Sequence, residues 1–460
     1  MNSNITSQIV QVILETSFEH LDSTTVQGAR ERIIDTIGCS IGGANAAGCQ
    51  MLLGLLREWG GGQEATILAH GGKLPAHNAA MMNSIMARSY DFEPCGCRVA
   101  DKTTPAHISG TTVPAALAVG EQMAVSGKEL LAALILGDDL TARITAASNV
   151  NLDSGFEPTG TINMFGAAAI AGKLYNLTAR QMTNAFGIVL NQLAGTFQNI
   201  FDGGLTFKLP QGLSARAGIF SAALARRGFT GVREAFFSKY GYFSLYCRTC
   251  EPKYLTKELG KKFYANNTFK AYPCCRSTHA AIDCALELGQ TKDISPEEIK
   301  EVVVEVAAIG HDFAVGQDFT IREVPQTDAS FSLQYTVANA LARKSMRLEH
   351  FTEDYIRDPA VLDLISRIRL KATVPPETPL AAGVRVIMRN GEQYEKRVEV
   401  PKGNEMFSPL TIEEKREKFI HNVTFSGTVP LKHAEEALDM LEHLEEIDDI
   451  GSISAMLVTC

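Results

Sequence analysis

The chain has 460 residues, of which 45% are apolar, and its formal net charge is -9. This composition predicts a globular protein with a substantial core and excludes a disordered chain, and the absence of a basic run excludes an electrostatic site for nucleic acid or an anionic membrane. No apolar run approaches the roughly 18 residues of a membrane span and no secretory signal opens the sequence, so we expect a cytoplasmic protein with reduced cysteines.

Helical patterns fill the chain up to about residue 265. The first two cover residues 5–21 and 22–43, and the second has Asp22 or Ser23 as its N-cap and Gly42-Gly43 as its stop. Several of the others are rich in Ala and Gly, which predicts helices buried on most of their surface. These patterns cover residues 75–90, 127–149, 162–177, 178–195 and 212–228. We expect residues 1–266 to form a large all-helical domain.

Runs of β-branched residues appear later, at 298–310 and 383–400. Asn390-Gly391 lies between two alternating runs, which predicts a β-hairpin. Two helical patterns, at 277–290 and 329–344, accompany the strands, so residues 267–400 are expected to form an α+β unit. Helical patterns return near the end of the chain, and residues 401–460 are expected to complete the first domain.

Chemically useful side chains are concentrated in the loop SYDFEPCGCRVADKTTPAHISG, residues 89–110, which offers Asp91, Thr104 and His107. Proton removal beside a carboxylate requires a base near neutrality, an acid, and cations that hold the carboxylates. The same residues also have ordinary explanations, because a histidine or an aspartate can simply cap or brace a loop. Other candidates lie elsewhere in the chain: Glu157, Lys208, Lys270 and Arg276.

Three cysteine pairs raise the alternative of a metal site. Cys95-Gly-Cys97, Cys247-x-x-Cys250 and Cys274-Cys275 could supply ligands for zinc or an iron–sulfur cluster. None of these pairs has a matching partner at structural-zinc spacing, and free cysteine is commonly buried. We therefore expect neither a metal nor a cofactor.

The order of several motifs resembles the MmgE/PrpD family. The matching segments are RERIIDTIGCSIGG (30–43), AAMMNSIMARSYDFEP (79–94), AHISGTTVPAALAVGE (106–121), GFEPTGTINMFGAAAIAGKL (155–174), FKAYPCCRSTHAAIDCAL (269–286) and DASFSLQYTVANAL (328–341). The resemblance implies a mainly α fold, in which an α+β lid is inserted into a large helical domain. It also implies an active site between the two, a homodimer and no required metal.

The resemblance also suggests roles for individual residues. Asp91 and His107 match the acid and the histidine of the family's catalytic loop, and Lys208 matches its active-site lysine. Arg143 falls where the family usually has an arginine. Two positions depart from the pattern, because Arg88 and Glu157 replace histidines that are common in the family.

We therefore expect a lyase or isomerase that acts at the carbon α to a carboxylate of a small di- or tricarboxylic acid. The leading interpretation is a hydro-lyase similar to 2-methylcitrate dehydratase, in which His107 is general acid or base, assisted by Asp91 or Glu157. The residues expected to hold the substrate are Lys208, Arg143, Lys270, Arg276 and Thr104. Three alternatives remain: epimerisation of an iminodisuccinate-like substrate, cis-aconitate-type decarboxylation, and a non-catalytic protein that binds a metal or another ligand.

Overall fold

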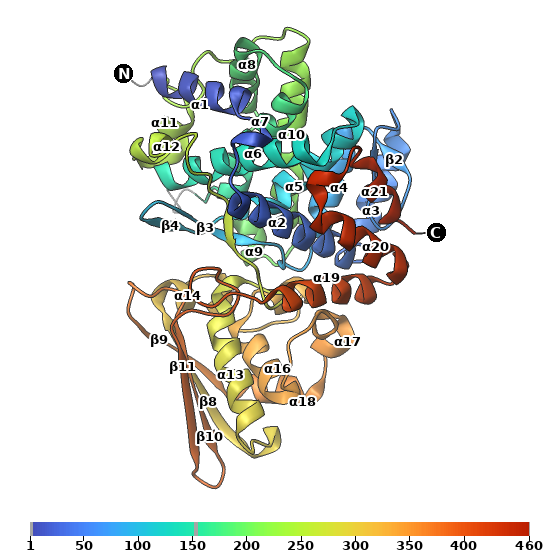
Figure 1. Cartoon of the computed structure of the whole chain (residues 1–460). Helices are drawn as coiled ribbons and strands as arrows, with labels where there is room; N and C mark the ends of the chain where they lie inside the picture. The colour runs from blue at the N-terminus through green and yellow to red at the C-terminus, as the bar shows by residue number, and fades with distance from the viewer. Residues whose placement is uncertain (1–2, 151–154, 460) are drawn as a thin grey trace.

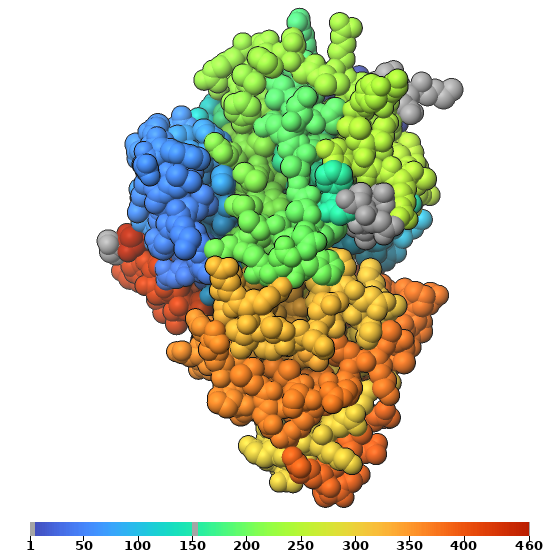
Figure 2. All heavy atoms as spheres, turned by 180° about the vertical axis from the view of Figure 1, so that it is seen from behind, coloured from blue at the N-terminus to red at the C-terminus, as the bar shows by residue number. Residues whose placement is uncertain are grey.

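The computed structural model describes residues 3–150 and 155–459, and it is mainly helical, as the sequence predicts. Figure 1 shows a helical part in the upper half of the view and a part with a four-stranded sheet below it. Figure 2 shows the two parts in contact across the width of the molecule. No helix in the described ranges is long and apolar enough to cross a membrane.

The helical part is built around long helices with buried, small-residue surfaces. Asp22 accepts a hydrogen bond from the Thr25 backbone amide at 2.9 Å and thereby begins α2. Gly218 of α10 shows why Ala and Gly are frequent, since a Cβ at this position would lie 2.5 Å from the Cβ of Ala167 in α7. The main helices are α1 Ser3–Glu15, α2 Ser23–Gly42, α3 Cys49–Trp59, α4 Ala76–Arg88, α5 Ser109–Met123, α6 Gly127–Ala147, α7 Pro158–Leu174, α8 Ala179–Val189 and α10 Leu209–Arg226. Shorter helices are α9 Gln198–Phe201, α11 Tyr242–Tyr246 and α12 Lys253–Thr256.

The prediction that this part is all-helical was wrong in one respect, because it contains three small antiparallel sheets. Their strands have two to five residues, too few to show a period-two pattern in the sequence. The sheet that matters for the site has the order β4-β3-β7, so the loop after α4 is joined to residues far along the chain. The strands are β1 Ala65–Thr66, β2 Lys73–Leu74, β3 Cys95–Val99, β4 Lys102–Thr104, β5 Ser148–Val150, β6 Cys247–Cys250 and β7 Asn266–Thr268.

The lower part contains one four-stranded sheet with the order β11-β10-β8-β9. β10 and β11 pair antiparallel around Asn390 and Gly391, and Gly391 has a positive φ of 91°, which confirms the predicted hairpin. The sequence did not predict β9, which pairs parallel with β8. The strands are β8 Ile299–Ala307, β9 Ile368–Val374, β10 Ala382–Met388 and β11 Gln393–Val398, and the helices are α13 His279–Thr291, α14 Ala308–Asp312, α15 Pro325–Ser330, α16 Leu333–Arg343, α17 Glu353–Ile356 and α18 Pro359–Ile365.

The chain returns to the helical part through α19 Ile412–Ser426, α20 Leu431–Glu442 and α21 Gly451–Met456, drawn in red in Figure 1. Both α19 and α20 pack on α2. Lys418 of α19 connects two elements of the helical part, because its Nζ lies 2.8 Å from Asp35 Oδ2 and donates at 2.8 Å to the carbonyl of Phe92. The loop that follows α4 is thus held from the C-terminal side of the chain.

Candidate active site

A cluster of ionisable side chains forms where α4 ends. Arg88 is the last residue of α4, Asp91 and Glu93 follow it, and His107 precedes α5. Asp91 has a left-handed backbone conformation with φ of 48°, which is unusual for a residue with a side chain. The pairing of β3 with β7 brings in Lys270 from beyond residue 266. Residues from both parts of the molecule therefore meet at one point.

Two buried cations neutralise two buried carboxylates in this cluster. Lys270 Nζ lies 2.7 Å from Asp91 Oδ1, and Arg88 Nη1 lies 2.9 Å from Glu93 Oε1 and also pairs with Asp91. All four side chains are at most 3% exposed. Burial opposes ionisation of Glu93, but Arg88 and His107 hold the pKa of this carboxyl well below its usual range. Glu93 is therefore a permanent anion at neutral pH.

His107 is the member of the cluster that reaches solvent, since its side chain is 24% exposed. Its Nδ1 lies 2.9 Å from Glu93 Oε1 and 3.1 Å from Arg88 Nη1. An ionised carboxylate can only accept and a guanidinium can only donate, so these two contacts require opposite tautomers. The closer contact with Glu93 favours a proton on Nδ1, which leaves a lone pair on Nε2. Burial and the charge of Arg88 lower the pKa of His107, so the neutral ring is a base near pH 7.

Glu157 is a second titratable side chain at this site. It lies at the N-terminal end of α7, is 4% exposed, and its Oε2 has no hydrogen-bond partner among the described residues. Burial raises the pKa of Glu157 from its ordinary value of 4.5 to about 7, against the opposing charge of Arg88. The negative charges of Asp91 and Glu93 also raise the pKa of Glu157, which indicates that this carboxyl lies within the electrostatic influence of the same cluster. A carboxyl with this pKa can hold a proton and release it near neutrality.

Two further cations, the buried Lys208 and the partly buried Arg276, lie beside the cluster without a carboxylate in ion-pair contact, as far as the described residues show. Lys208 Nζ donates to the carbonyl of Ala47 at 2.6 Å and to Ser89 Oγ at 3.1 Å, and burial lowers its pKa. Arg276 donates to the carbonyls of Lys402 at 2.7 Å and Pro401 at 2.9 Å. Positive charge held in this way favours an anionic ligand.

A cavity of about 740 Å³ opens next to these residues. Its lining includes Gly195, whose carbonyl accepts a hydrogen bond from the Glu157 backbone amide, and Leu209 and Pro210, which follow Lys208. The ionisable side chains of the cluster are not part of this lining. The cavity therefore borders residues that adjoin Glu157 and Lys208.

Two of the residues that we expect to bind substrate make their contacts outside the cluster. Arg143 is fully buried in the helical part, where its Nε lies 2.7 Å from Asp139 Oδ2 and its amino groups donate at 2.8 Å to the carbonyls of Lys257 and Lys262. These partners leave it no role at the cluster, and we regard it as structural. The hydroxyl of Thr104 lies 3.0 Å from Cys97 Sγ across the β3–β4 pair, so it stabilises the small sheet.

No role for Arg88 or Glu93 followed from the sequence, although Arg88 departs from the family pattern. Glu93 belongs to the DFEP segment and Arg88 lies three residues before it, so the charge pattern at positions 88, 91 and 93 was a usable signal. Ligand atoms of Asp91, Glu93 and His107 lie within 4.8 Å of one another, which is close enough to hold a metal ion. However, Arg88 and Lys270 already contact the same carboxylates. This arrangement fits paired cations better than a divalent metal.

Comparison with known proteins gives matches over nearly the whole chain. The MmgE/PrpD N-terminal domain matches residues 7–255, and the MmgE/PrpD C-terminal domain matches residues 272–446. Cis-aconitate decarboxylase of Homo sapiens is 23% identical over 476 residues, which cover 99% of this chain and 95% of that protein. Cis-aconitate decarboxylase of Aspergillus terreus is 23% identical over 483 residues, with 99% and 96% covered. The cis-aconitate decarboxylase-like protein oryM of Aspergillus oryzae is 21% identical over 481 residues, with 99% and 97% covered.

Proposed function

The chain belongs to the MmgE/PrpD family, and we propose that it is a lyase that transfers protons at the carbon α to a carboxylate of a small di- or tricarboxylic acid. The specific reaction that we propose is dehydration, similar to that of 2-methylcitrate dehydratase. One observation carries this proposal: the guanidinium of Arg88 lowers the pKa of both the neutral base, His107, and the buried acid, Glu157, whose pKa is about 7. Dehydration needs both groups, because one proton leaves carbon while another joins the departing hydroxyl.

In the proposed reaction His107 Nε2 removes the α proton, and the electron pair of the broken C–H bond moves toward the adjacent carboxylate. Lys208, Lys270 and Arg276 stabilise the enolate-like charge that develops there. Glu157 then protonates the leaving hydroxyl as the C–O bond breaks, so that water and an alkene are the products. Proton exchange with solvent restores neutral His107 and protonated Glu157. General acid–base groups of this kind each contribute about 10²–10⁴-fold to the rate.

We also propose that residues 267–400 act as a lid over the site and that the working enzyme is a homodimer. The lid is supported by Lys270, which belongs to this segment and contacts Asp91 in the helical part. Phe313 supports it as well, because its ring packs against those of Phe197 at 5.6 Å and Phe201 at 5.0 Å. Opening of this segment would admit the substrate, and its closure would then exclude water from the site.

Decarboxylation of a cis-aconitate-like acid is the second candidate. It is favoured by the relatives reported above, two of which are named cis-aconitate decarboxylases. In that reaction the cations would hold the remaining carboxylates, carbon dioxide would leave, and an acid such as Glu157 would protonate the carbon. The two candidates predict different products from the same site.

Proton NMR in deuterium oxide distinguishes them. The full chain is incubated with 2-methylcitrate, citrate, cis-aconitate and an iminodisuccinate-like acid, and the spectra are followed for deuterium at the α position, for alkene signals and for loss of a carboxyl group. We expect exchange with formation of an alkene, and its loss in His107→Gln. The control is His311→Gln, since the His311 side chain is 38% exposed and pairs only with Asp312 among the described residues. No exchange with any acid, or equal exchange in His107→Gln, would contradict the proposal.

A further inference from the structure

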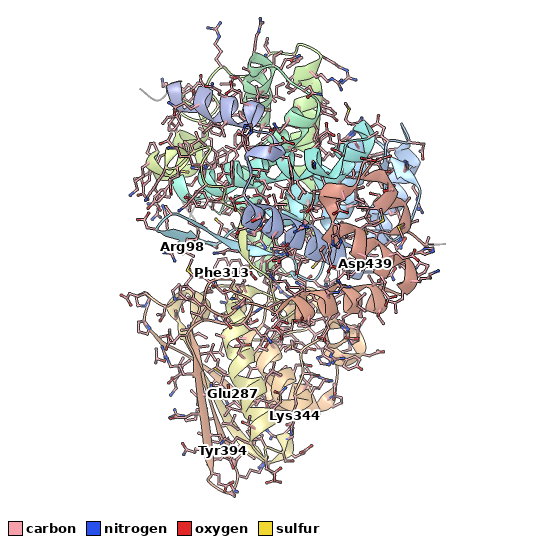
Figure 3. All side chains as sticks on the ribbon, in the orientation of Figure 1. Arg98, Glu287, Phe313, Lys344, Tyr394 and Asp439 are labelled. Atoms are coloured by element: carbon pink, nitrogen blue, oxygen red, sulfur yellow. The ribbon has the colours of Figure 1, made fainter. Side chains whose placement is uncertain are left out.

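A second cavity, of about 600 Å³, opens on another side of the small sheet. Its lining combines the start of α2, the β3–β4 turn and the segment that leads into β7. Three cations line it, Arg32, Arg98 and Lys262, and its lining includes no acidic side chain among the described residues. Figure 3 shows Arg98 at the boundary between the helical part and the sheet-bearing part. The charged side chains that line the cavity are therefore all positive, and the cavity is large enough for a ligand.

Arg32 is the deepest of these cations and is 7% exposed. Its Nε donates to Asp138 Oδ2 at 3.1 Å, whereas its two terminal amino groups have no protein acceptor in the part of the chain that the structure describes. Gly28 makes room for them, since a Cβ at Gly28 would lie 3.2 Å from Arg32 Nη1. A buried guanidinium that lines a cavity with free donors requires an acceptor, and an anion supplies the strongest one.

The other walls also favour negative charge. Among the described residues, Arg98 Nη1 contacts only the thioether of Met406, at 3.1 Å, which is a weak acceptor, while its Nε donates to the carbonyl of Ala100 at 3.1 Å. The side chain of Lys262 is 64% exposed, and its Nζ lies 3.4 Å from Glu258. The first turn of α2 contributes Thr24 and Thr25 to the lining, but the carboxylate of Asp22 already caps this helix end, so the attraction for an anion comes from the three cations.

We propose that this cavity is a second anion site, separate from the reacting groups, for a small polyanion that carries carboxylate or phosphate groups. Its volume lies within the range of about 300–1,000 Å³ that is usual for small-molecule pockets. Three cations around one cavity match a ligand with more than one anionic group. Arg32 anchors the buried end of the ligand, and Arg98 and Lys262 contact it nearer to solvent.

Asn266 connects this cavity to the catalytic loop. Its side chain lines the cavity, and its Oδ1 accepts hydrogen bonds from the backbone amides of Ile108 at 3.0 Å and Ser109 at 2.8 Å. Its Nδ2 donates to the carbonyls of Gly96 at 2.9 Å and Ala106 at 3.1 Å. A ligand that contacts Asn266 thus acts on both sides of the loop that carries His107. This regulatory consequence rests on the proposed function, whereas the binding itself does not.

Isothermal titration calorimetry of the full chain tests the binding, with pyrophosphate and tricarballylate as separate probes. Arg98→Gln is the test variant and Arg357→Gln is the matched control, because Arg357 is 51% exposed and pairs with Glu353. We expect saturable binding of at least one probe, weakened about tenfold or more in Arg98→Gln and unchanged in Arg357→Gln. Lys208→Gln should keep this binding, because Lys208 lies at the other site.

Absence of saturable binding would overturn the proposal. So would binding that disappears in Lys208→Gln and persists in Arg98→Gln, since the anion would then lie at the candidate active site. Binding of pyrophosphate alone would identify phosphate as the preferred anionic group, and binding of tricarballylate alone would identify carboxylate. Hydrogen–deuterium exchange tests the connection: the probe should slow exchange in residues 95–109 of the wild type and not of Arg98→Gln. Unchanged exchange during saturated binding would refute the connection to the loop. None of these measurements depends on turnover, so they stand apart from the test of lyase activity.

Discussion

Replacement of Glu157 by Gln should make the protein less active and, above neutral pH, more stable. The carboxyl is buried, and its pKa in the folded protein is about 7 instead of 4.5. The unfolded chain therefore loses this proton at a lower pH than the folded protein does, so the group makes the folded state less stable as the pH rises from about 4.5 to about 7. At about 1.4 kcal/mol per pKa unit, the difference between 4.5 and about 7 corresponds to about 3.5 kcal/mol above pH 7. Gln has the same shape and never ionises, so the variant avoids this loss.

The assay is thermal unfolding of wild type and Glu157→Gln at pH 5 and pH 8, combined with turnover at both pH values. We expect the apparent Tm of the variant to exceed that of the wild type by a few degrees at pH 8 and to be similar at pH 5, with turnover reduced about 10²–10⁴-fold. Glu353→Gln is the control, because the Glu353 side chain is 63% exposed. Equal Tm differences at the two pH values would refute the raised pKa, and full activity would refute the role as acid.

Three other predictions follow from the site. The pH profile of kcat/KM should be bell-shaped. It should rise below pH 6.5 as His107 loses its proton and fall near pH 7 as Glu157 loses its proton. A flat profile between pH 5 and 8 would contradict both roles. Lys208→Met should raise KM for the carboxylate substrate by tenfold or more, as measured by steady-state kinetics. The apparent Tm in a thermal melt should stay the same or rise, because the substitution removes a desolvated cation. Arg143→Lys should lower stability by about 3 kcal/mol or more without changing KM, as measured by thermal unfolding and kinetics, because lysine cannot keep the contacts with Asp139 and two separate carbonyls.

The sequence predicts the helices well because their signals are local. Asp22 as an N-cap and the Ala- and Gly-rich faces of α7 and α10 depend only on nearby residues and on the 3.6-residue period. The short strands gave no such signal. β3 becomes a strand through its pairing with β4 and with β7, and β7 is about 170 positions later in the chain. Tertiary contacts, and not propensity, determine that sheet.

The candidate site was predictable in its residue types and less so in its geometry. The loop motif pointed to Asp91 and His107, and the structure brings them together with Lys270. The role of Arg88 was not foreseen, because it depends on the left-handed turn at Asp91 and on burial, which a sequence does not show. The surroundings of Arg143 were not predictable either, since the carbonyls that it contacts come from residues more than one hundred positions away.

The two departures from the family pattern are best understood together. Arg88 and Glu157 occupy positions where the resemblance to the family led us to expect histidine, and the charge of Arg88 lowers the pKa of Glu157. Arg88 adds a positive charge, and Glu157 adds a negative charge only when its carboxyl is ionised, so the pair matches the charge of two neutral histidines only above about pH 7. Arg88→His alone should therefore raise the pKa of Glu157 further and move the falling limb of the pH profile to higher pH.

A double-mutant cycle tests this interdependence through pH profiles and thermal unfolding of Arg88→His, Glu157→His and the double variant. Arg88→His alone should cost about 3–5 kcal/mol of stability, because it leaves Asp91 and Glu93 with fewer cationic partners. The double variant should be less destabilised than the sum of the single variants, by about 0.5–3 kcal/mol. Strict additivity would show that the two positions act independently. The guanidinium would then serve the carboxylates of the loop alone, and the acid at position 157 would owe its pKa to burial.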